Sequence, residues 1–436
     1  MRLDVIDNHR SRFVPLASGW HQRKMRFAVK SYQTKKNEDE NPTVLSLTKT
    51  GLKVKTDLSF GKSTENYVGH QVVERGQLVF TPRDFDATPI LCGVADTRGC
   101  ISNLYIVFDV SPQIHAKFLE YYFWGLKYGF EFFKKLSFGM RYSFNRTQFE
   151  NIPLLHPDLA TQRQIADFLD RETARIDLLI EKKQRLVVLL EDHWDRFAFD
   201  LFALETPTRF DVDKSDWQNR KLKFLSPKVT VGIVVTPAAY YVDGGVPAIR
   251  GTNIREMVVR LDDMVSITPE GHRINRKSAV AEGDILVVRT GQPGTAAVVP
   301  KVLDGANCID VILIKKSNKY LSDLVAHFLN SSAAKAQYSS GSSGAIQQHF
   351  NISIASNLVV PVPPMHEQDR ILKILEREGQ RVRTLQRTLH ESIDRLKEYR
   401  AALITNAVTG QINVATYAKS GTSDRQLDAI QEEMGA

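Results

Sequence analysis

The sequence has few cysteines and no long apolar run. Only 3 of its 436 residues are cysteine (Cys92, Cys100 and Cys308), and they form no CxxC pair. A disulfide framework or a thiolate metal site is therefore not expected, and a reducing compartment fits. The sequence also has no run of 18 apolar residues and no charged-then-apolar leader. We therefore expect a protein of the cytoplasm, with no membrane partner.

Motifs of common catalytic sites are absent as well. Gly61-Lys-Ser matches the end of a phosphate-binding loop, but Thr56 stands where that loop needs its first glycine. Asn41-Pro-Thr is not the Asn/Asp-Pro-Pro-aromatic motif of amino-methyltransferases, and there is no HExxH or nuclease metal set. The sequence therefore predicts neither catalytic residues nor metal ligands in this chain.

One stretch of the sequence occurs twice, 206 positions apart. Landmarks outside it, such as Trp20 and Trp217, keep the same order in both halves. A repeat of this length indicates a duplicated structural unit. The pairs that align without a gap are Gln162/Gln368, Ile165/Ile371, Leu169/Leu375, Arg171/Arg377, Glu172/Glu378 and Arg175/Arg381.

Each copy of the repeat opens a long amphipathic helix. Apolar residues recur at steps of three and four with charged residues between them, which is typical of the narrow seam of a coiled coil. At 1.5 Å per residue, about 40 residues give each helix a length of roughly 60 Å. The predicted seam residues are Ile165, Leu169, Ile176, Leu179, Leu186, Leu190, Ile371, Leu375, Val382, Leu385, Leu389 and Leu396.

The segments outside the helices mix strand and helix signals. Short β-branched runs such as Val44–Leu47 and Val311–Ile314 predict strands, and His115–Tyr128 and Leu321–Tyr338 predict helices. We therefore expect an α+β fold in which two α/β domains alternate with the two helices. The predicted boundaries are 1–158, 159–206, 207–364, 365–410 and a polar, poorly ordered tail at 411–436.

Positive charge is concentrated on the two α/β segments. Residues 1–158 contain 22 Lys/Arg against 16 Asp/Glu, and residues 207–364 contain 18 against 13, whereas residues 159–206 contain 7 against 10. Two basic modules separated by an acidic helix suggest a polyanion that is contacted at two places.

Several loops carry side chains suited to reading DNA bases. Arg289-Thr-Gly-Gln-Pro-Gly294 lies between two apolar runs, and Arg250-Gly-Thr-Asn-Ile-Arg255 has similar chemistry. Guanidinium and amide groups can read guanine and adenine in a major groove. Any one such loop is more often a solvated turn than a base contact, but we expect at least one of them to lie at the interface. The DNA-binding candidates are Arg83, Arg141, Tyr142, Asn145, Arg146, Arg250, Thr252, Asn253, Arg255, Arg289, Thr290, Gln292, Gln347, Gln348 and His349.

Four stretches and the order of the segments resemble the DNA-specificity subunits of type I restriction–modification systems. These stretches are 246–254 (VPAIRGTNI), 282–291 (EGDILVVRTG), 361–371 (PVPPMHEQDRI) and 400–410 (RAALITNAVTG). The first half departs from the family pattern, with Thr161 where a glutamate is usual and Thr81-Pro-Arg-Asp-Phe in place of the Arg-Thr-Gly-x-Pro-Gly loop.

The resemblance implies two target-recognition domains joined by an antiparallel coiled coil with a pseudo-twofold relation between halves. Each domain would read one half of a bipartite target in double-stranded DNA. The chain would be a non-catalytic adaptor that docks two methyltransferase subunits and restriction/translocase subunits. S-adenosylmethionine, ATP and Mg would belong to those partners, with no cofactor in this chain.

Two other functions are compatible with the sequence. One is a stand-alone bipartite DNA-binding protein, which a net charge of only +5 or +6 per domain makes less favourable. The other is a coiled-coil scaffold whose modules bind proteins. A neighbouring gene for a methyltransferase with an Asn-Pro-Pro-aromatic motif would favour the adaptor over both.

Overall fold

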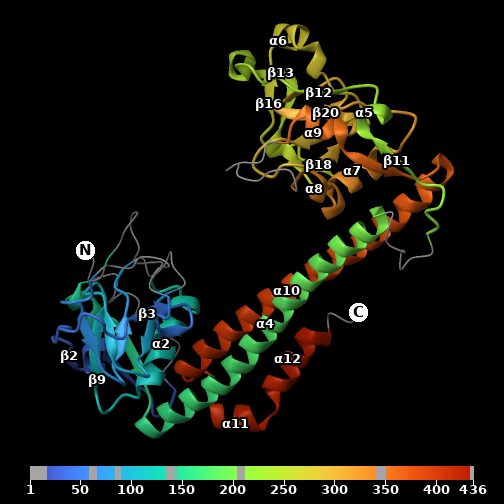
Figure 1. Ribbon diagram of the computed structural model, residues 1–436. Helices are drawn as coiled ribbons and strands as arrows, with labels where there is room; N and C mark the ends of the chain where they lie inside the picture. Colours follow the sequence, from blue (N-terminus) through green and yellow to red (C-terminus); the bar gives the residue numbers. More distant parts are fainter. Residues whose placement is uncertain are drawn as a thin grey trace. The chain divides into compact units, whose positions relative to one another are not determined.

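The computed structural model describes residues 17–57, 66–83, 90–133, 143, 145–203, 212–339 and 350–432. The chain forms two compact units, one made of Met1–Gln184 with Thr388–Ala436 (unit 1) and one made of Arg185–Arg387 (unit 2). Each unit contains one α/β domain and a part of both long helices, α4 (Leu159–Phe202) and α10 (Met365–Val408) (Figure 1). Both helices have 44 residues and begin 206 positions apart, as the repeat requires.

The domain of unit 1 is built on a four-stranded antiparallel sheet in the order β2-β9-β6-β7. Its core is rich in aromatic side chains, with Phe149 packed 5.1 Å from Phe80 and 5.5 Å from Phe108 between ring centroids. Its elements are β1 (His21–Lys24), β2 (Val29–Tyr32), β3 (Leu45–Thr48), β4 (Gly51–Val54), β5 (Gln71–Val73), β6 (Leu78–Phe80), β7 (Cys92–Val94), β8 (Gly99–Ile101), β9 (Ile106–Val110), α2 (Ala116–Tyr128), α3 (Arg146–Glu150) and β10 (Pro153–His156).

The domain of unit 2 repeats this plan with a sheet in the order β12-β20-β17-β18. In both domains a short strand after the repeated tryptophan pairs with the strand that precedes the long helix, as β1-β10 and as β11-β21. The elements of the unit 2 domain are β11 (Gln218–Lys221), α5 (Leu222–Leu225), β12 (Val229–Val231), β13 (Tyr241–Arg250), β14 (Ile254–Arg255), β15 (Val258–Val259), β16 (Val265–Ile267), α6 (Pro269–Ile274), β17 (Ile285–Val288), β18 (Ala296–Val298), β19 (Asn307–Ile309), β20 (Val311–Ile314), α7 (Ser322–Asn330), α8 (Ser332–Ser339), α9 (Ile352–Asn357) and β21 (Val359–Val362).

The helix predicted at Leu321–Tyr338 is in fact two helices, α7 and α8. Ser331 breaks it by taking an extended conformation with φ −73° and ψ 157°. Its hydroxyl donates to the Phe328 carbonyl and accepts from the Ala334 N–H, so it ends one helix and begins the next. A serine whose side chain competes for backbone hydrogen bonds favours such a break, which the apolar spacing did not reveal.

The two long helices run antiparallel within each unit. In unit 1 the Arg400 guanidinium donates to the Asp177 carboxylate at 3.2 Å, and in unit 2 His193 Nε2 lies 2.9 Å from Glu378 Oε1. Higher numbers on α10 thus face lower numbers on α4. Ten of the twelve predicted seam residues are buried or half-buried, namely Ile165, Leu169, Ile176, Leu179, Leu190, Ile371, Leu375, Val382, Leu389 and Leu396.

Two predicted seam residues were wrong. Leu186 and Leu385 are 47% and 42% exposed, whereas their neighbours Val187 and Gln386 are buried and half-buried. The run from Leu186 to Leu190 is apolar at every position, so its composition does not fix which residue continues the seam. The alternating steps of three and four residues pass through the buried Lys183, and a step of four from Lys183 makes Val187 the next seam residue.

The predicted disordered tail was also wrong. Residues after 410 form α11 (Val414–Lys419) and α12 (Thr422–Glu432), which pack on the long helices in unit 1 (Figure 1). Leu427 is completely buried, and the Asn413 side chain caps α11 by accepting from Ala415 and Thr416 N–H. Only one narrow face of α12 is buried, so few of its residues are apolar. The helical spacing of those residues is therefore difficult to recognise in a polar sequence.

A buried glutamine ties each long helix to its domain in the same way. Gln162 accepts from His115 N–H at 2.8 Å and donates to the carbonyls of Pro157 and Gln113. Gln368 accepts from Leu321 N–H at 2.7 Å, and donates to the carbonyls at the equivalent places in unit 2. His115 and Leu321 are the residues just before α2 and α7, whose first turns have no side-chain cap of their own. Each glutamine therefore joins three segments.

We predict that Gln368→Leu lowers the free energy of unfolding by about 1–3 kcal/mol, because it leaves a buried N–H and two carbonyls without partners. Gln380→Leu is the matched control, since Gln380 is exposed on the same helix. Urea unfolding followed by circular dichroism measures both variants. Equal midpoints for the two would contradict a structural role for Gln368.

Candidate nucleic-acid interface

A groove in unit 2 brings together the two loops that the sequence singles out. The loop at 250–255 and the loop at 289–292 are 34 or more residues apart in the chain, yet they line one groove together with the β19–β20 corner. The charged side chains of this groove are three arginines and one aspartate. The lining residues are Arg250, Gly251, Thr252, Ile254, Arg255, Val288, Arg289, Thr290, Gly291, Gln292, Ile309 and Asp310.

Arg289 is one of the arginines that line this groove, and an ion pair holds it in place. It follows directly after the buried strand β17, and its guanidinium forms an ion pair with Asp310, whose side chain is 46% exposed. Asp310 lies between β19 and β20 with a left-handed φ of +49°. The pairing restricts the Arg289 side chain to one orientation while part of it stays open to solvent, which favours recognition of a planar acceptor edge.

Two glycines allow the 289–294 loop to make a tight turn between its two flanking strands. Gly291 and Gly294 have φ of +86° and +90°, a region that other residues rarely adopt. A side chain at Gly294 would also collide with the Tyr338 hydroxyl, which donates to the Pro293 carbonyl at 3.1 Å. Thr290 and Gln292 are exposed on the outside of this loop. The loop therefore presents an amide and a hydroxyl on a restrained backbone.

The 250–255 loop divides into exposed and buried positions. Arg250 Nη2 donates to the Asp263 carbonyl, and Arg255 Nη1 donates to the Thr252 carbonyl at 2.9 Å, so both guanidiniums are held at the groove wall. Asn253 was wrong as a DNA-contact candidate. It is 2% exposed, and its amide bridges the Arg250 N–H and the Asp262 carbonyl.

The first domain also has an arginine beyond the corresponding strand. Arg83 stands 206 positions before Arg289, just beyond strand β6, and it is exposed. Its backbone forms a bridge with Ser143, and in unit 2 the Arg289 carbonyl accepts from Phe350 N–H. Arg141 and Tyr142, like Gln347, Gln348 and His349, lie outside the described residues.

Two further candidates of the first domain have local structural roles. The Asn145 side chain caps α3 by accepting from Gln148 N–H at 2.8 Å, as Asn351 caps α9 in unit 2. The Arg146 guanidinium lies 3.9 Å from the centroid of the Tyr32 ring, a cation–π contact. Both residues are exposed, but their polar groups are already engaged.

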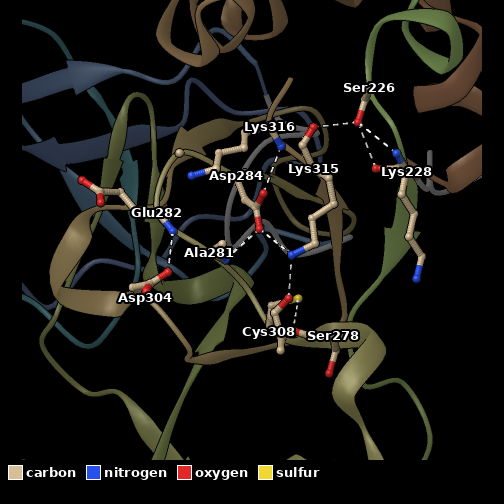
Figure 2. Close-up of polar contacts among 12 residues, drawn as sticks. Ser226, Lys228, Ser278, Ala281, Glu282, Asp284, Asp304, Cys308, Lys315 and Lys316 are labelled. Carbon is tan, nitrogen blue, oxygen red and sulfur yellow. Dashed lines mark hydrogen bonds and ion pairs between the residues drawn. The ribbon is translucent and has the colours of Figure 1, made fainter. Parts of the chain in front are cut away.

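A buried aspartate and its half-buried lysine partner in unit 2 stabilise the domain. The Asp284 carboxylate accepts from Ala281 N–H, Lys316 N–H and Lys315 Nζ, the last at 2.6 Å (Figure 2). Lys315 also donates to the Ala279 carbonyl. Both oxygens of this carboxylate thus accept hydrogen bonds from the domain's own backbone or from Lys315, which indicates a structural role.

Cys308 lies beside this network and is unsuited to nucleophilic chemistry. It is fully buried, and burial raises the pKa of its thiol to about 12. A thiol with that pKa stays protonated at neutral pH. Within the described residues, no group of three or more His, Cys, Asp or Glu side chains is placed to hold a metal ion.

Sequence reasoning missed Asp310. Nothing in its local motif marks it as functional. It directly follows Cys308-Ile309, which matches Cys100-Ile101 in the first half, but the residue that follows there is Ser102. The helices that the structure describes include none long and apolar enough to cross a membrane.

These features define a protein with two equivalent α/β recognition domains, each attached to an antiparallel pair of long helices. Residues 28–187 and 214–395 match the profile of the type I restriction modification DNA specificity domain. Because the two matches cover well over half of the sequence, the chain belongs to this family.

Individual relatives agree with the family assignment. The specificity subunit of the Escherichia coli type I restriction enzyme EcoBI is 21% identical over 284 residues, which is 61% of this chain and 59% of that protein. The match therefore spans less than two thirds of the curated relative.

Solved structures show the same fold. A chain from a type I R-M system, in a study of complex assembly and conformational transition, has a TM-score of 0.72 at 15% identity and covers 92% of this chain and 100% of its own. The HsdS subunit from Thermoanaerobacter tengcongensis has a TM-score of 0.51 at 16% identity, covering 92% and 99%.

We predict that Asn253→Ala lowers the free energy of unfolding by about 1–3 kcal/mol, because the Arg250 N–H and the Asp262 carbonyl lose their partner inside the domain. Thr252→Ala, at the exposed neighbouring position, should change stability by less than about 0.5 kcal/mol. Chemical denaturation of both variants provides the comparison. A stable Asn253→Ala protein would restore Asn253 as a candidate for ligand contact.

Proposed function

We propose that this chain is the DNA-specificity subunit of a type I restriction–modification complex. Each domain reads one half of a bipartite double-stranded target. The observation that carries this proposal is the groove of unit 2, where Arg250, Arg255 and Arg289 line one surface with the exposed amide of Gln292. Family membership supports the same function.

The chemistry of the groove suits base edges in a major groove. An arginine can donate two hydrogen bonds to O6 and N7 of guanine, and a glutamine can pair with N6 and N7 of adenine. Arg289 is the best candidate for a guanine contact because Asp310 fixes its guanidinium, and the exposed part of Asp310 can accept from the N4 amino group of a cytosine. Arg83 has the corresponding role in the first domain.

The chain itself supplies recognition and docking. In this proposal two methyltransferase subunits bind along the helices and the adjoining domain surfaces, and restriction/translocase subunits complete the complex. S-adenosylmethionine, ATP and Mg are bound by those partners, and this chain contributes no catalytic residue.

The long helices set the distance between the two half-sites. A helix pair with a continuous 3–4 seam is stiff, so a change in its length moves and rotates one domain relative to the DNA that the other domain binds. The preferred spacer between half-sites then depends on helix length and is independent of the loops that read bases.

Co-expression with the methyltransferase of the same locus, followed by sequencing of N6-methyladenine in the host DNA, tests the function. The proposal predicts one bipartite motif that is methylated in both halves. A stable complex that methylates no bipartite motif would contradict it.

We predict that Arg289→Ala weakens binding of the assembled methyltransferase to its target DNA by about 5- to 150-fold, the equivalent of 1–3 kcal/mol for one base contact. Arg273→Ala removes the same charge from an exposed position on α6, so it serves as the control. Fluorescence anisotropy with a labelled duplex, repeated with each base of the half-site changed, measures both affinity and specificity. An equal loss for both variants would mean that Arg289 contributes only general charge.

We predict that inserting one heptad after Lys183 and another after Leu389 lengthens the preferred spacer by about three base pairs. Seven residues add about 10.5 Å at 1.5 Å per residue, and a base pair rises 3.4 Å. Whole heptads keep the seam in register, and the two insertion points are 206 positions apart. Methylome sequencing should recover unchanged half-sites with a longer spacer. Recovery of the original spacer would show that the helices do not set the distance.

A further inference from the structure

A short loop of the second domain exposes two valines to solvent. Residues 229–242 contain no charged side chain, although the domain around them is basic. Within this stretch Val234 is 49% exposed and Val235 is 78% exposed, and no large hydrophobic side chain that the structure describes is more exposed than Val235. A side chain of this kind gains free energy when another apolar group covers it. We call residues 234–239 the apolar loop.

Backbone hydrogen bonds fix both ends of the apolar loop to the domain. Just before it, the Ile233 N–H donates to the Cys308 carbonyl, and the Ile233 carbonyl accepts from the Asp310 N–H. Just after it, the Tyr240 carbonyl accepts from the Thr268 N–H at 2.8 Å. The loop between these two anchors therefore has a defined position on the domain.

The turn within the apolar loop has a backbone conformation that its residue rarely adopts. Thr236 has φ +40° and ψ +51°, which is unusual for a β-branched side chain and is further restricted by the proline that follows. Its carbonyl accepts from the Ala239 N–H at 3.0 Å, which closes the turn. Such conformations are concentrated at binding sites, where the surrounding structure maintains them. The turn holds Val235 in its exposed position.

The apolar loop adjoins the groove that the arginines line. Ile309 and Asp310 belong to the lining of that groove, and Ile233 forms a bridge with the first and a hydrogen bond with the second. Asp310 in turn forms the ion pair with Arg289. Val234 directly follows Ile233 in the chain, so the apolar loop continues the surface of the groove on its Asp310 side.

The composition of the apolar loop limits what it can recognise in DNA. It has no cation for a phosphate group, and a valine side chain has no hydrogen-bonding group for the polar atoms of a base. Among the groups that base pairs present in a major groove, the apolar one is the C5 methyl of thymine. The loop is therefore suited to thymine, whereas the neighbouring groove is suited to guanine and adenine.

The first domain has a different segment at the corresponding place. Strand β2 occupies the edge of its sheet as β12 does in unit 2, and Gln33-Thr-Lys-Lys36 follows it. Lys35 and Lys36 are exposed, and lysines in such a position suit phosphate contacts, which carry no sequence information. A contact with a thymine methyl is therefore expected in only one of the two half-sites.

We propose that Val235 covers the C5 methyl group of a thymine in the half-site of the second domain. The inference rests on the proposed function and deepens it, because it assigns base specificity to a residue beyond the lining of the groove. Each half-site in that function contains a methylated adenine, so a thymine lies in the opposite strand. Arg289 and Val235 then contact neighbouring base pairs, one through hydrogen bonds and the other through an apolar contact.

The test replaces each thymine of the bipartite target by uracil, one at a time, in a labelled duplex. Uracil keeps the hydrogen-bonding groups of thymine and lacks only the C5 methyl. Fluorescence anisotropy measures binding by the chain assembled with its methyltransferase. Removal of the contacted methyl should weaken binding about fourfold, the equivalent of about 0.8 kcal/mol for one buried carbon group. The sensitive thymine should lie in one half-site only.

Two variants of the chain complete the measurement. Val235→Ala should bind the thymine duplex about fourfold more weakly and should lose its sensitivity to that uracil. Val302→Ala is the matched control, because Val302 is 70% exposed but follows the end of β18 that lies away from the Arg289 loop. It should keep both the affinity and the sensitivity of the unmodified chain. Circular dichroism checks that each variant is folded.

Three results would overturn the proposal. The first is that no single uracil weakens binding, and the second is that Val235→Ala stays as sensitive to uracil as the unmodified chain. The third is an equal loss for thymine and uracil duplexes in Val235→Ala, since Val235 would then contact the sugar, a minor groove or a partner subunit. The proposed function survives all three if the assembled complex still binds its bipartite duplex specifically, whereas absence of specific binding would overturn both.

Discussion

The hydrogen bonds of Gln162 and Gln368 are the contacts on which the arrangement of this protein depends. Each amide is fully buried and joins the first turn of a long helix to the turn before it and to the start of a domain helix. An amide in that position is costly unless all of its partners are present, so the domain and the helix must pack together in one geometry. In the proposed function, this fixed attachment is what allows the helices to set the spacer between the half-sites.

Duplication gives the two halves the same scaffold and leaves their loops free to differ. The sheet order, the strand pairing before each long helix and the capping asparagines are shared, whereas the residues around Arg83 and Arg289 diverge. In the proposed function, this division keeps two recognition domains in register while their different loops contact different bases. The main departure from symmetry among the described elements is α11–α12, which packs on the long helices of unit 1 alone.

Much of the architecture could be predicted from the sequence because it depends on periodic burial. The repeat and the 3–4 spacing predicted two long helices, and these begin at Leu159 and Met365. Where periodicity was ambiguous, the prediction was wrong. The apolar run at 186–190 did not identify the seam residue, and the polar surroundings of Leu427 concealed α12, since a single buried leucine is a weak pattern.

The candidate site was predictable only in part. Two loops with arginine, glutamine and glycine were recognisable, and the structure places them in one groove. Sequence alone did not distinguish Asn253, which supports the backbone, from its exposed neighbour Thr252, because both have polar side chains in the same motif. The role of Asp310 could be recognised only from the structure, because it depends on a contact with Arg289, 21 positions away in the sequence.

In the proposed function, two equivalent domains each contact one half of the target. Hydroxyl-radical footprinting of the complex assembled with its methyltransferase on the target duplex tests this most directly. The account predicts two protected patches of backbone, one over each half-site, separated by a spacer whose bases can be changed without loss of protection. A single continuous patch that depends on every base, or protection of one half-site alone, would contradict it.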